Sequence, residues 1–294
     1  MFEGFESKTI ATSGGASIFC RHAGSGPPLL LLHGNPQTHA IWHLIAPRLA
    51  EKFHVIAADL RGYGDSTGPG DPTRAVYPTE DYTFRAMGQD MVEVMSAFGH
   101  ERFNICGHDR GGRTTHRLCL DQPERLIKAA ILDILPTRHV WENVNAAWAA
   151  KSWHWIFMPQ EGGLPEAMIE GVPAAFYMER KIGKPGMGMG IFAPEALAEY
   201  VRCFTPKTIR ASCADYRAAA TLDLEMDRAD TGRLSTVPTL VLWGAKSHTQ
   251  AMFAAPLDIW RNYVADVQGQ GIVSGHYMAE HAPEEVLAAL LGFY

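Results

Sequence analysis

Short apolar runs recur along the chain and are separated by segments with helical periodicity. Residues 28–32 and 54–58 are almost continuously apolar, and residues 127–132 and 239–243 repeat this pattern. An unbroken apolar run is typical of a strand that is buried on both faces of a parallel sheet. Residues 84–98 instead place apolar side chains at the spacing of an amphipathic helix. Strands that alternate with helices predict an α/β fold, with a mostly parallel sheet flanked by helices.

This alternation fails between residues 137 and 216. The segment is rich in Trp, Met and Gly and has several short helical patterns, but it has no convincing buried strand. We therefore expect a helical cap at 137–216, inserted into one α/β core whose two parts are residues 1–136 and 217–294. Within the cap, the glycine-rich stretch 183–190 predicts a mobile loop.

Composition and charge exclude some classes of partner. The chain has 294 residues, of which 47% are hydrophobic and 20% charged, and its formal net charge is -6. It has no basic stripe, so neither nucleic acid nor an anionic membrane is an expected partner. No apolar stretch approaches the ~18 residues of a membrane span and the N-terminus has no signal-peptide pattern, so we expect a cytoplasmic protein. The five cysteines are scattered without metal-binding spacing, which predicts reduced thiols that pack in the interior.

Residues 107–113, Gly-His-Asp-Arg-Gly-Gly-Arg, carry the most specific chemical signal. They follow residues 102–106, which we interpret as a strand, and precede a helix that we expect from about Gly112. Small residues on both sides of Asp109 permit the strained strand-to-helix turn of a nucleophile elbow, with a carboxylate where serine is usual. A carboxylate can displace a leaving group from saturated carbon and form an ester that water then cleaves. The alternative is an ordinary glycine-rich turn in which Asp109 caps the helix.

A general base and an acid should accompany such a nucleophile. His276 has the best position among the 13 histidines, because it follows a possible strand and precedes the final helix; His248 and His281 are the fallback bases. Asp133 ends the apolar run 127–132, where a charge is costly unless it has a partner such as protonated His276. The alternatives are an exposed loop histidine and an aspartate that caps the start of the cap.

Two further features lie near the expected nucleophile. Residues 33–36, His-Gly-Asn-Pro, follow the first buried strand, and the backbone N–H of Asn35 can form an oxyanion hole with that of Arg110. Arg110 and Arg113 are three residues apart at a helix start, so both can face one anion, and a substrate carboxylate suits them. The alternatives are simple loop geometry at 33–36 and an ordinary surface pair of arginines.

Together these motifs resemble the fluoroacetate (haloacetate) dehalogenases of the α/β-hydrolase superfamily. The likeness runs through nearly the whole chain and is most specific in the elbow heptapeptide and in the Trp-His-Trp segment 153–155. The resemblance implies an α/β-hydrolase fold with an inserted cap, and it suggests a homodimer. It also implies a role for each site residue: Asp109 as nucleophile, Arg110 and Arg113 as carboxylate ligands, Asp133 orienting His276, and His154, Trp155 and Tyr216 binding the departing halide.

Two departures from the family pattern bear on substrate range. The family usually has Phe where this chain has Asn35, whereas the related haloalkane dehalogenases carry Asn there and use it against the halide. Those enzymes follow the nucleophile with Trp, where this chain has Arg110. The family also tends to have a Trp near residues 182–185, and this chain has none there. Asn35 is therefore a polar lining of the pocket or an additional halide contact.

The expected reaction is hydrolysis of a 2-haloacetate to glycolate and halide through an aspartyl ester, without a metal or an organic cofactor. One alternative is an epoxide hydrolase with the same Asp, His and acid, for which Tyr216 could protonate the epoxide oxygen. The paired arginines favour an anionic substrate over a neutral epoxide. Another alternative is a non-catalytic receptor that binds a small acid.

Overall fold

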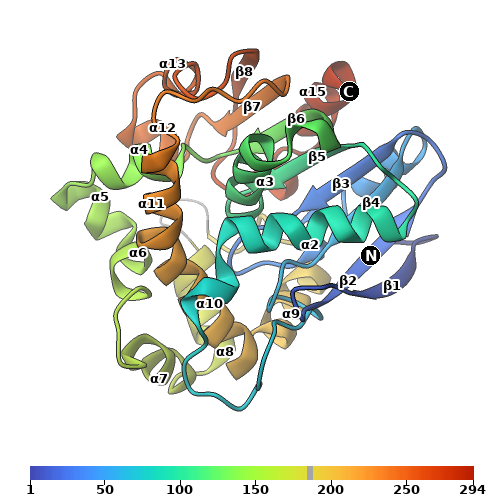
Figure 1. Ribbon diagram of the computed structural model, residues 1–294. Coiled ribbons are helices and arrows are strands. Elements are labelled where there is room, and N and C mark those ends of the chain that lie inside the picture. The colour runs from blue at the N-terminus through green and yellow to red at the C-terminus, as the bar shows by residue number, and fades with distance from the viewer. Residues whose placement is uncertain (184–187) are drawn as a thin grey trace.

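The computed structural model describes residues 1–183 and 188–294, and its centre is an eight-stranded sheet in the order β1-β2-β4-β3-β5-β6-β7-β8 (Figure 1). Neighbouring strands are parallel except at one edge, where β2 is antiparallel to both β1 and β4. This sheet confirms the predicted α/β-hydrolase architecture. The strands are β1 (Glu6–Ala11), β2 (Ser17–Ala23), β3 (Pro28–Leu32), β4 (His54–Ala58), β5 (Phe103–His108), β6 (Leu126–Leu132), β7 (Thr239–Gly244) and β8 (Val267–Ile272).

Helices cover both faces of the sheet. Leu30 and Leu32 of β3 belong to a buried cluster with α2 (Phe84–Ala97) and α3 (Arg110–Asp121). Leu29 and Leu31 belong to a second cluster with α1 (Ala46–Ala50) and α15 (Pro283–Phe293). Successive side chains of a strand point to opposite faces, so a strand covered on both sides must be apolar throughout. This packing explains the unbroken apolar runs.

The antiparallel edge was not predicted from the sequence. Five of the six residues of β1 are exposed, and only Ile10 is buried. The strand therefore lacks the alternating apolar pattern by which a half-buried strand is recognised. Its place in the sheet depends on the backbone register with β2, in which Glu6 pairs with His22 and Ala11 with Ser17.

The described residues between β6 and β7 form helices and loops but no strand, as the sequence predicted. They lie at one end of the sheet (Figure 1). The boundary predicted at 216 falls inside α10, and the helical segment continues through α11 before the core resumes. The predicted mobile loop at 183–190 includes 184–187, which lie outside the described residues. The helices are α4 (Thr137–Glu142), α5 (Ala146–Lys151), α6 (Trp153–Phe157), α7 (Leu164–Glu170), α8 (Ala174–Ile182), α9 (Pro194–Cys203), α10 (Pro206–Ala220) and α11 (Leu222–Ala229).

Short helices complete the core around the sheet. Six of them occupy loops between the larger elements: η1 (His39–Trp42), η2 (Thr79–Tyr82), η3 (Pro123–Arg125), α12 (His248–Met252), α13 (Pro256–Trp260) and α14 (Met278–His281). All five cysteines are buried and unpaired, as the sequence predicted. Within the described part of the chain, no helix combines the length and the apolar character that crossing a membrane requires.

A buried carboxyl joins the cap to the core. Glu280 of α14 accepts hydrogen bonds from Nε2 of Gln37 at 2.6 Å and from the hydroxyl of Tyr200 on α9 at 2.9 Å. Burial raises the pKa of Glu280 from its ordinary 4.5 to about 8, although both hydrogen bonds act in the opposite direction. Glu280 is therefore largely protonated at neutral pH.

The raised pKa of Glu280 predicts a pH-dependent stability. Between pH 4.5 and 8 the folded protein holds this proton and the unfolded chain releases it, so the free energy of unfolding falls as the pH rises. The slope from one such group is at most about 1.4 kcal/mol per pH unit. Glu280→Gln should remove this contribution, which denaturant unfolding at several pH values would measure. The exposed Glu285→Gln is the control, and equal slopes for both variants would contradict the interpretation.

Candidate active site

The chain turns sharply at Asp109, between the end of β5 and the start of α3. Asp109 has φ 48° and ψ −112°, a strained conformation for a residue with a side chain. A Cβ atom at Gly107 would lie 2.2 Å from the carbonyl oxygen of Gly111, so this turn requires glycine. The helix begins at Arg110, two residues before the predicted start. The Asp109 side chain makes no capping hydrogen bond, which excludes the interpretation as a helix cap.

Asp109 is positioned and ionised by its neighbours. Its Oδ1 accepts a hydrogen bond from the backbone N–H of Asn35 at 2.9 Å, and its Oδ2 lies 3.9 Å from Nε2 of His276. Burial alone would raise the pKa of Asp109, but its electrostatic interactions with His276, Arg110 and Arg113 lower the pKa below its ordinary value. The carboxylate is therefore charged at neutral pH, and among the described residues its Oδ2 accepts no hydrogen bond from the backbone.

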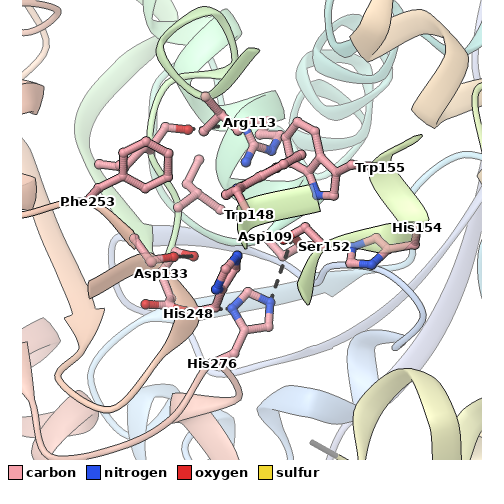
Figure 2. A pocket seen from close by; sticks show the side chains of 14 residues that line it. Asp109, Arg113, Asp133, Trp148, Ser152, His154, Trp155, His248, Phe253 and His276 are labelled. Atoms are coloured by element: carbon pink, nitrogen blue, oxygen red, sulfur yellow. Dashed lines mark hydrogen bonds and ion pairs between the residues drawn. The ribbon is translucent and has the colours of Figure 1, made fainter. Parts of the chain in front are cut away.

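The predicted acid and base form a hydrogen-bonded pair. Nδ1 of His276 lies 2.6 Å from Oδ2 of Asp133, and Figure 2 shows the ring between the two aspartates. The other oxygen of Asp133 accepts from the backbone N–H of Gly244 at 2.9 Å and from the hydroxyl of Ser247 at 2.8 Å. The N-cap of α4 is Pro136, so Asp133 does not cap the cap domain. With every oxygen satisfied, Asp133 fixes the ring so that Nε2 faces Asp109.

The fallback histidines occupy other places. Nδ1 of His281 accepts a hydrogen bond from the backbone N–H of Gly275, so His281 supports the loop that carries His276. His248 lies beside His276 in the wall of the cavity (Figure 2). Neither replaces His276 in the contact with Asp109.

His108 is a supporting residue that the sequence analysis missed. Its Nε2 donates to the carbonyl oxygen of His276 at 2.9 Å. Burial lowers the pKa of His108 to about 3, so the ring is neutral at physiological pH and can keep its single proton on Nε2. The ring therefore ties the residue before the nucleophile to the loop of the base. Its position directly before Asp109 was the available signal.

The turn at 33–36 brings the Asn35 N–H to Asp109, which is the contact that the oxyanion-hole prediction requires. The second predicted donor, the N–H of Arg110, is the first amide of α3, and such amides have no acceptor within their own helix. The side chain of Asn35 points toward the cap, where Nδ2 donates to the hydroxyl of Ser212 at 3.0 Å. Its buried Oδ1 has no partner among the described residues.

The two arginines are buried and have different partners. Arg113 donates from Nη1 to the carbonyl of Leu135 and the hydroxyl of Thr137, both at 3.0 Å, and it stacks on Trp155 at 4.5 Å. Arg110 forms a buried ion pair with Asp215 of α10 and also donates to its backbone carbonyl. Burial excludes the alternative of a surface pair. Only part of the Arg110 guanidinium is uncommitted, since its Nη1 has no partner among the described residues.

Asp215 is a second residue whose role the sequence analysis missed. Its Oδ2 accepts from Nε of Arg110 at 2.8 Å and from the hydroxyl of Tyr63 at 2.6 Å. Although burial lowers the pKa of Arg110, the Asp215 carboxylate raises it above its ordinary value. Asp215 lies in a helix that also carries Lys207, Arg210 and Arg217, so the local sequence gave no signal of its pairing with Arg110.

A small cavity of about 70 Å³ lies between the nucleophile and the cap (Figure 2). His154 and Trp155 of α6 reach it from the cap, and Asp109, Arg113 and His276 reach it from the core. Tyr216 and Arg110 are not part of its lining. They pack behind it, with the Tyr216 ring 5.6 Å from His154 and 4.2 Å from the Arg110 guanidinium. The remaining wall consists of Asp133, Ile134, Leu135, Val140, Trp148, Ser152, His248, Thr249 and Phe253.

Known proteins are similar to this chain in sequence. Residues 27–156 match the family described as the alpha/beta hydrolase fold. The chain is 40% identical to a fluoroacetate dehalogenase from Burkholderia sp, over 100% of this chain and 95% of the relative. It belongs to the haloacetate dehalogenases of the α/β-hydrolase superfamily. It is also 30% identical to a soluble epoxide hydrolase from Corynebacterium sp. (strain C12), over 92% of this chain and 91% of the relative.

Solved structures agree with this membership. The crystal structure of ALR0039 from Nostoc sp PCC 7120 is 46% identical and superposes with a TM-score of 0.94, covering 100% of this chain and 99% of that one. The epoxide hydrolase CorEH is 28% identical, with a TM-score of 0.87 and 98% of each chain covered. Both solved structures, one of them an epoxide hydrolase, thus share the whole fold with this chain.

Gly34 of this dehalogenase family member leaves space for the nucleophile. A Cβ atom at Gly34 would lie 2.3 Å from Cβ of Asp109 and 2.6 Å from its Oδ1. Gly34→Ala should therefore displace Asp109 and reduce hydrolytic activity by about 100-fold, since a 1 Å misplacement can have this effect. Steady-state kinetics and thermal melting would measure the change.

The matched control is Gly292→Ala in α15. A Cβ atom there would meet nothing within 4 Å, so activity and melting temperature should stay close to wild type. Wild-type kinetics in Gly34→Ala would show that the nucleophile does not depend on this close approach.

Proposed function

We propose that the protein hydrolyses 2-haloacetates to glycolate and halide. The observation that carries this proposal is the ionised carboxylate of Asp109 at the elbow, which lines a small cavity together with Arg113. A carboxylate nucleophile suits displacement at saturated carbon, and a buried arginine suits a substrate carboxylate. The 40% identity to a fluoroacetate dehalogenase supports the same substrate class.

In the first step, Oδ2 of Asp109 attacks the carbon that bears the halogen. The new bond is a carbon–oxygen ester bond, and the halide leaves with the electron pair of the broken carbon–halogen bond. Arg113 holds the substrate carboxylate and, with the uncommitted Nη1 of Arg110, orients the carbon for in-line attack. The small cavity, about 70 Å³, favours short acids such as fluoroacetate and chloroacetate.

In the second step, Nε2 of His276 removes a proton from water, and the resulting hydroxide adds to the ester carbonyl of Asp109. The carbonyl oxygen is the former Oδ1, which already accepts from the Asn35 N–H at 2.9 Å. The oxyanion hole therefore binds this oxygen before negative charge develops on it. Asp133 stabilises the imidazolium, and collapse of the intermediate releases glycolate and regenerates the Asp109 carboxylate, with one proton passing to solvent overall.

His154, Trp155 and Tyr216 are proposed to hold the departing halide. The rings of Trp155 and Tyr216 are 6.1 Å apart, and His154 contacts Tyr216 at 5.6 Å between ring centres. Indole N–H, imidazole N–H and phenol O–H are donors that compensate a halide for its lost water. A cytoplasmic location and a homodimer stay predictions from the sequence.

Epoxide hydrolysis is the alternative reaction for this machinery, since a full-length relative has that activity. It needs a phenol that reaches the epoxide oxygen. Among the described residues no tyrosine lines the cavity, whereas Arg113 does, and its guanidinium favours an anionic substrate over a neutral epoxide. Turnover of either substrate would exclude a non-catalytic receptor.

Replacement of the nucleophile and of the base should stop different steps. We expect Asp109→Asn to abolish halide release, since the amide cannot form the ester. His276→Ala should release about one halide per active site and then stop, because the ester forms but is not hydrolysed. Ion-selective measurement of halide would follow both variants, and mass spectrometry should find a carboxymethyl group on Asp109 in His276→Ala.

The control for the first variant is Asp266→Asn, which changes an exposed aspartate away from the cavity. Full turnover by Asp109→Asn, with mass spectrometry excluding deamidation of the new Asn, would overturn the proposed mechanism. Release of halide from neither fluoroacetate nor chloroacetate by the folded wild type would overturn the proposed function.

Removal of one halide donor should discriminate between halogens. Tyr216→Phe should reduce kcat for fluoroacetate by about 10- to 100-fold, because a hydrogen bond to a charged group contributes about 1.5–3 kcal/mol. The effect on chloroacetate should be smaller, since chloride is less strongly hydrated. Tyr77→Phe is the control, because its partly buried hydroxyl donates to the carbonyl of Pro72 away from the cavity. Equal losses for both substrates would exclude Tyr216 as a halide ligand.

A further inference from the structure

A second and larger cavity lies directly outside the active-site cavity. It has a volume of about 500 Å³, and His154, His248 and His276 line both spaces. We call this outer space the vestibule. A small molecule that passes from the vestibule to Asp109 must move past these three histidines. Figure 2 shows His248 beside His276, with His154 farther along the wall of the inner pocket.

The wall of the vestibule is positively charged. Four cations line it: Lys151, Arg180, Lys181 and Lys246. Its described lining contains no carboxylate, and its other members are Ala150, Trp153, Ser247, Ala251 and the three shared histidines. The whole chain has a net charge of -6, so the positive charge of the vestibule is opposite in sign to the net charge of the protein.

Separate elements bring these cations together. Lys151 ends α5, Arg180 and Lys181 lie on α8, and Lys246 follows β7 in the core. Lys151, Arg180 and Lys246 are exposed, whereas Lys181 is buried, with its Nζ 5.7 Å from the centre of the Tyr216 ring. The positive charge therefore continues from the surface toward the residues around the inner cavity.

We propose that the vestibule is an anion-binding site that collects small carboxylates and delivers them to the inner cavity. A concave site of one charge raises the local concentration of the opposite ion and the rate of its capture, by about 10- to 1000-fold where steering is strong. The inference rests on the proposed function for its substrate, a 2-haloacetate anion. The vestibule itself is defined by its lining and is tested separately.

The kinetic test removes the three exposed cations in the triple variant Lys151→Gln, Arg180→Gln, Lys246→Gln. At an ionic strength of about 10 mM, where the Debye length is about 30 Å, kcat/KM for chloroacetate should fall about 10-fold. The loss should lie in KM rather than kcat, because these side chains do not touch Asp109. At about 0.5 M salt the difference from wild type should shrink to less than about 2-fold.

The control has the same change in charge at exposed cations elsewhere, Lys8→Gln, Lys52→Gln and Arg74→Gln. It should keep the wild-type kcat/KM and the wild-type dependence on salt. An unchanged kcat/KM in the vestibule triple variant at low salt, or an equal loss in the control triple variant, would overturn the proposal.

A second measurement does not depend on dehalogenation. Trp153 lines the vestibule and is 38% exposed, whereas Trp42, Trp148, Trp155 and Trp260 are buried. Iodide, an anion, and acrylamide, which is neutral, both quench indole fluorescence. The difference in quenching between the wild type and Trp153→Phe is the part that comes from Trp153, and this part reports on the vestibule. At low salt, the vestibule triple variant should reduce the iodide component several-fold and leave the acrylamide component unchanged.

Equal iodide quenching of Trp153 in wild type and in the vestibule triple variant would overturn the proposal even if the protein is a dehalogenase. Conversely, the wild type could release no halide while the vestibule triple variant still reduces iodide quenching. In that case the anion-binding site would stand, and only the proposed 2-haloacetate substrate would be wrong.

Discussion

The site depends on one constraint, the burial of an ionised carboxylate at the nucleophile elbow. Asp109 is 7% exposed and charged, and such a group persists only where other charges and donors compensate for lost water. Arg110, Arg113 and His276 supply this compensation. Each of these groups is itself buried or half-buried, so each also needs a hydrogen-bonding or charged partner, and these partners lie farther from Asp109.

One of these partners joins the cap to the core. Arg110 is fully buried and is neutralised by Asp215 of α10, which also accepts from Tyr63 of the core. Removal of one partner from a buried ion pair typically costs about 3–5 kcal/mol. The same interaction therefore stabilises the docking of α10 and leaves Arg113, whose Nη1 faces neutral acceptors, as the less compensated cation beside the cavity. Burial and the neighbouring Arg110 lower the pKa of Arg113 to about 10, and it is still charged at neutral pH.

The sequence contained the residues that act through local geometry. Apolar runs located the inner strands because both faces of the sheet are covered, and the glycines around Asp109 located the elbow because only small residues fit there. Asp133 was found by the cost of a charge at the end of an apolar strand. The structure places it 2.6 Å from His276, as that argument requires.

Residues whose role depends on long-range packing could not be found in this way. The pairing of Arg110 with Asp215 spans 105 positions in the chain, and no spacing rule connects them. The antiparallel edge strand β1 was missed because most of its side chains are exposed. The proposed halide ligands were named from the family resemblance for the same reason, since Tyr216 and Trp155 come from helices that meet only in the folded cap. Steric requirements and the cost of burying a charge can be inferred from one sequence, but the residue that compensates a buried charge is determined by how the helices pack.

Most of the features that could not be predicted from the sequence therefore lie in the cap. The cap lines one side of the cavity, supplies the counter-ion of Arg110 and, with Lys246 of the core, forms the positive wall of the vestibule.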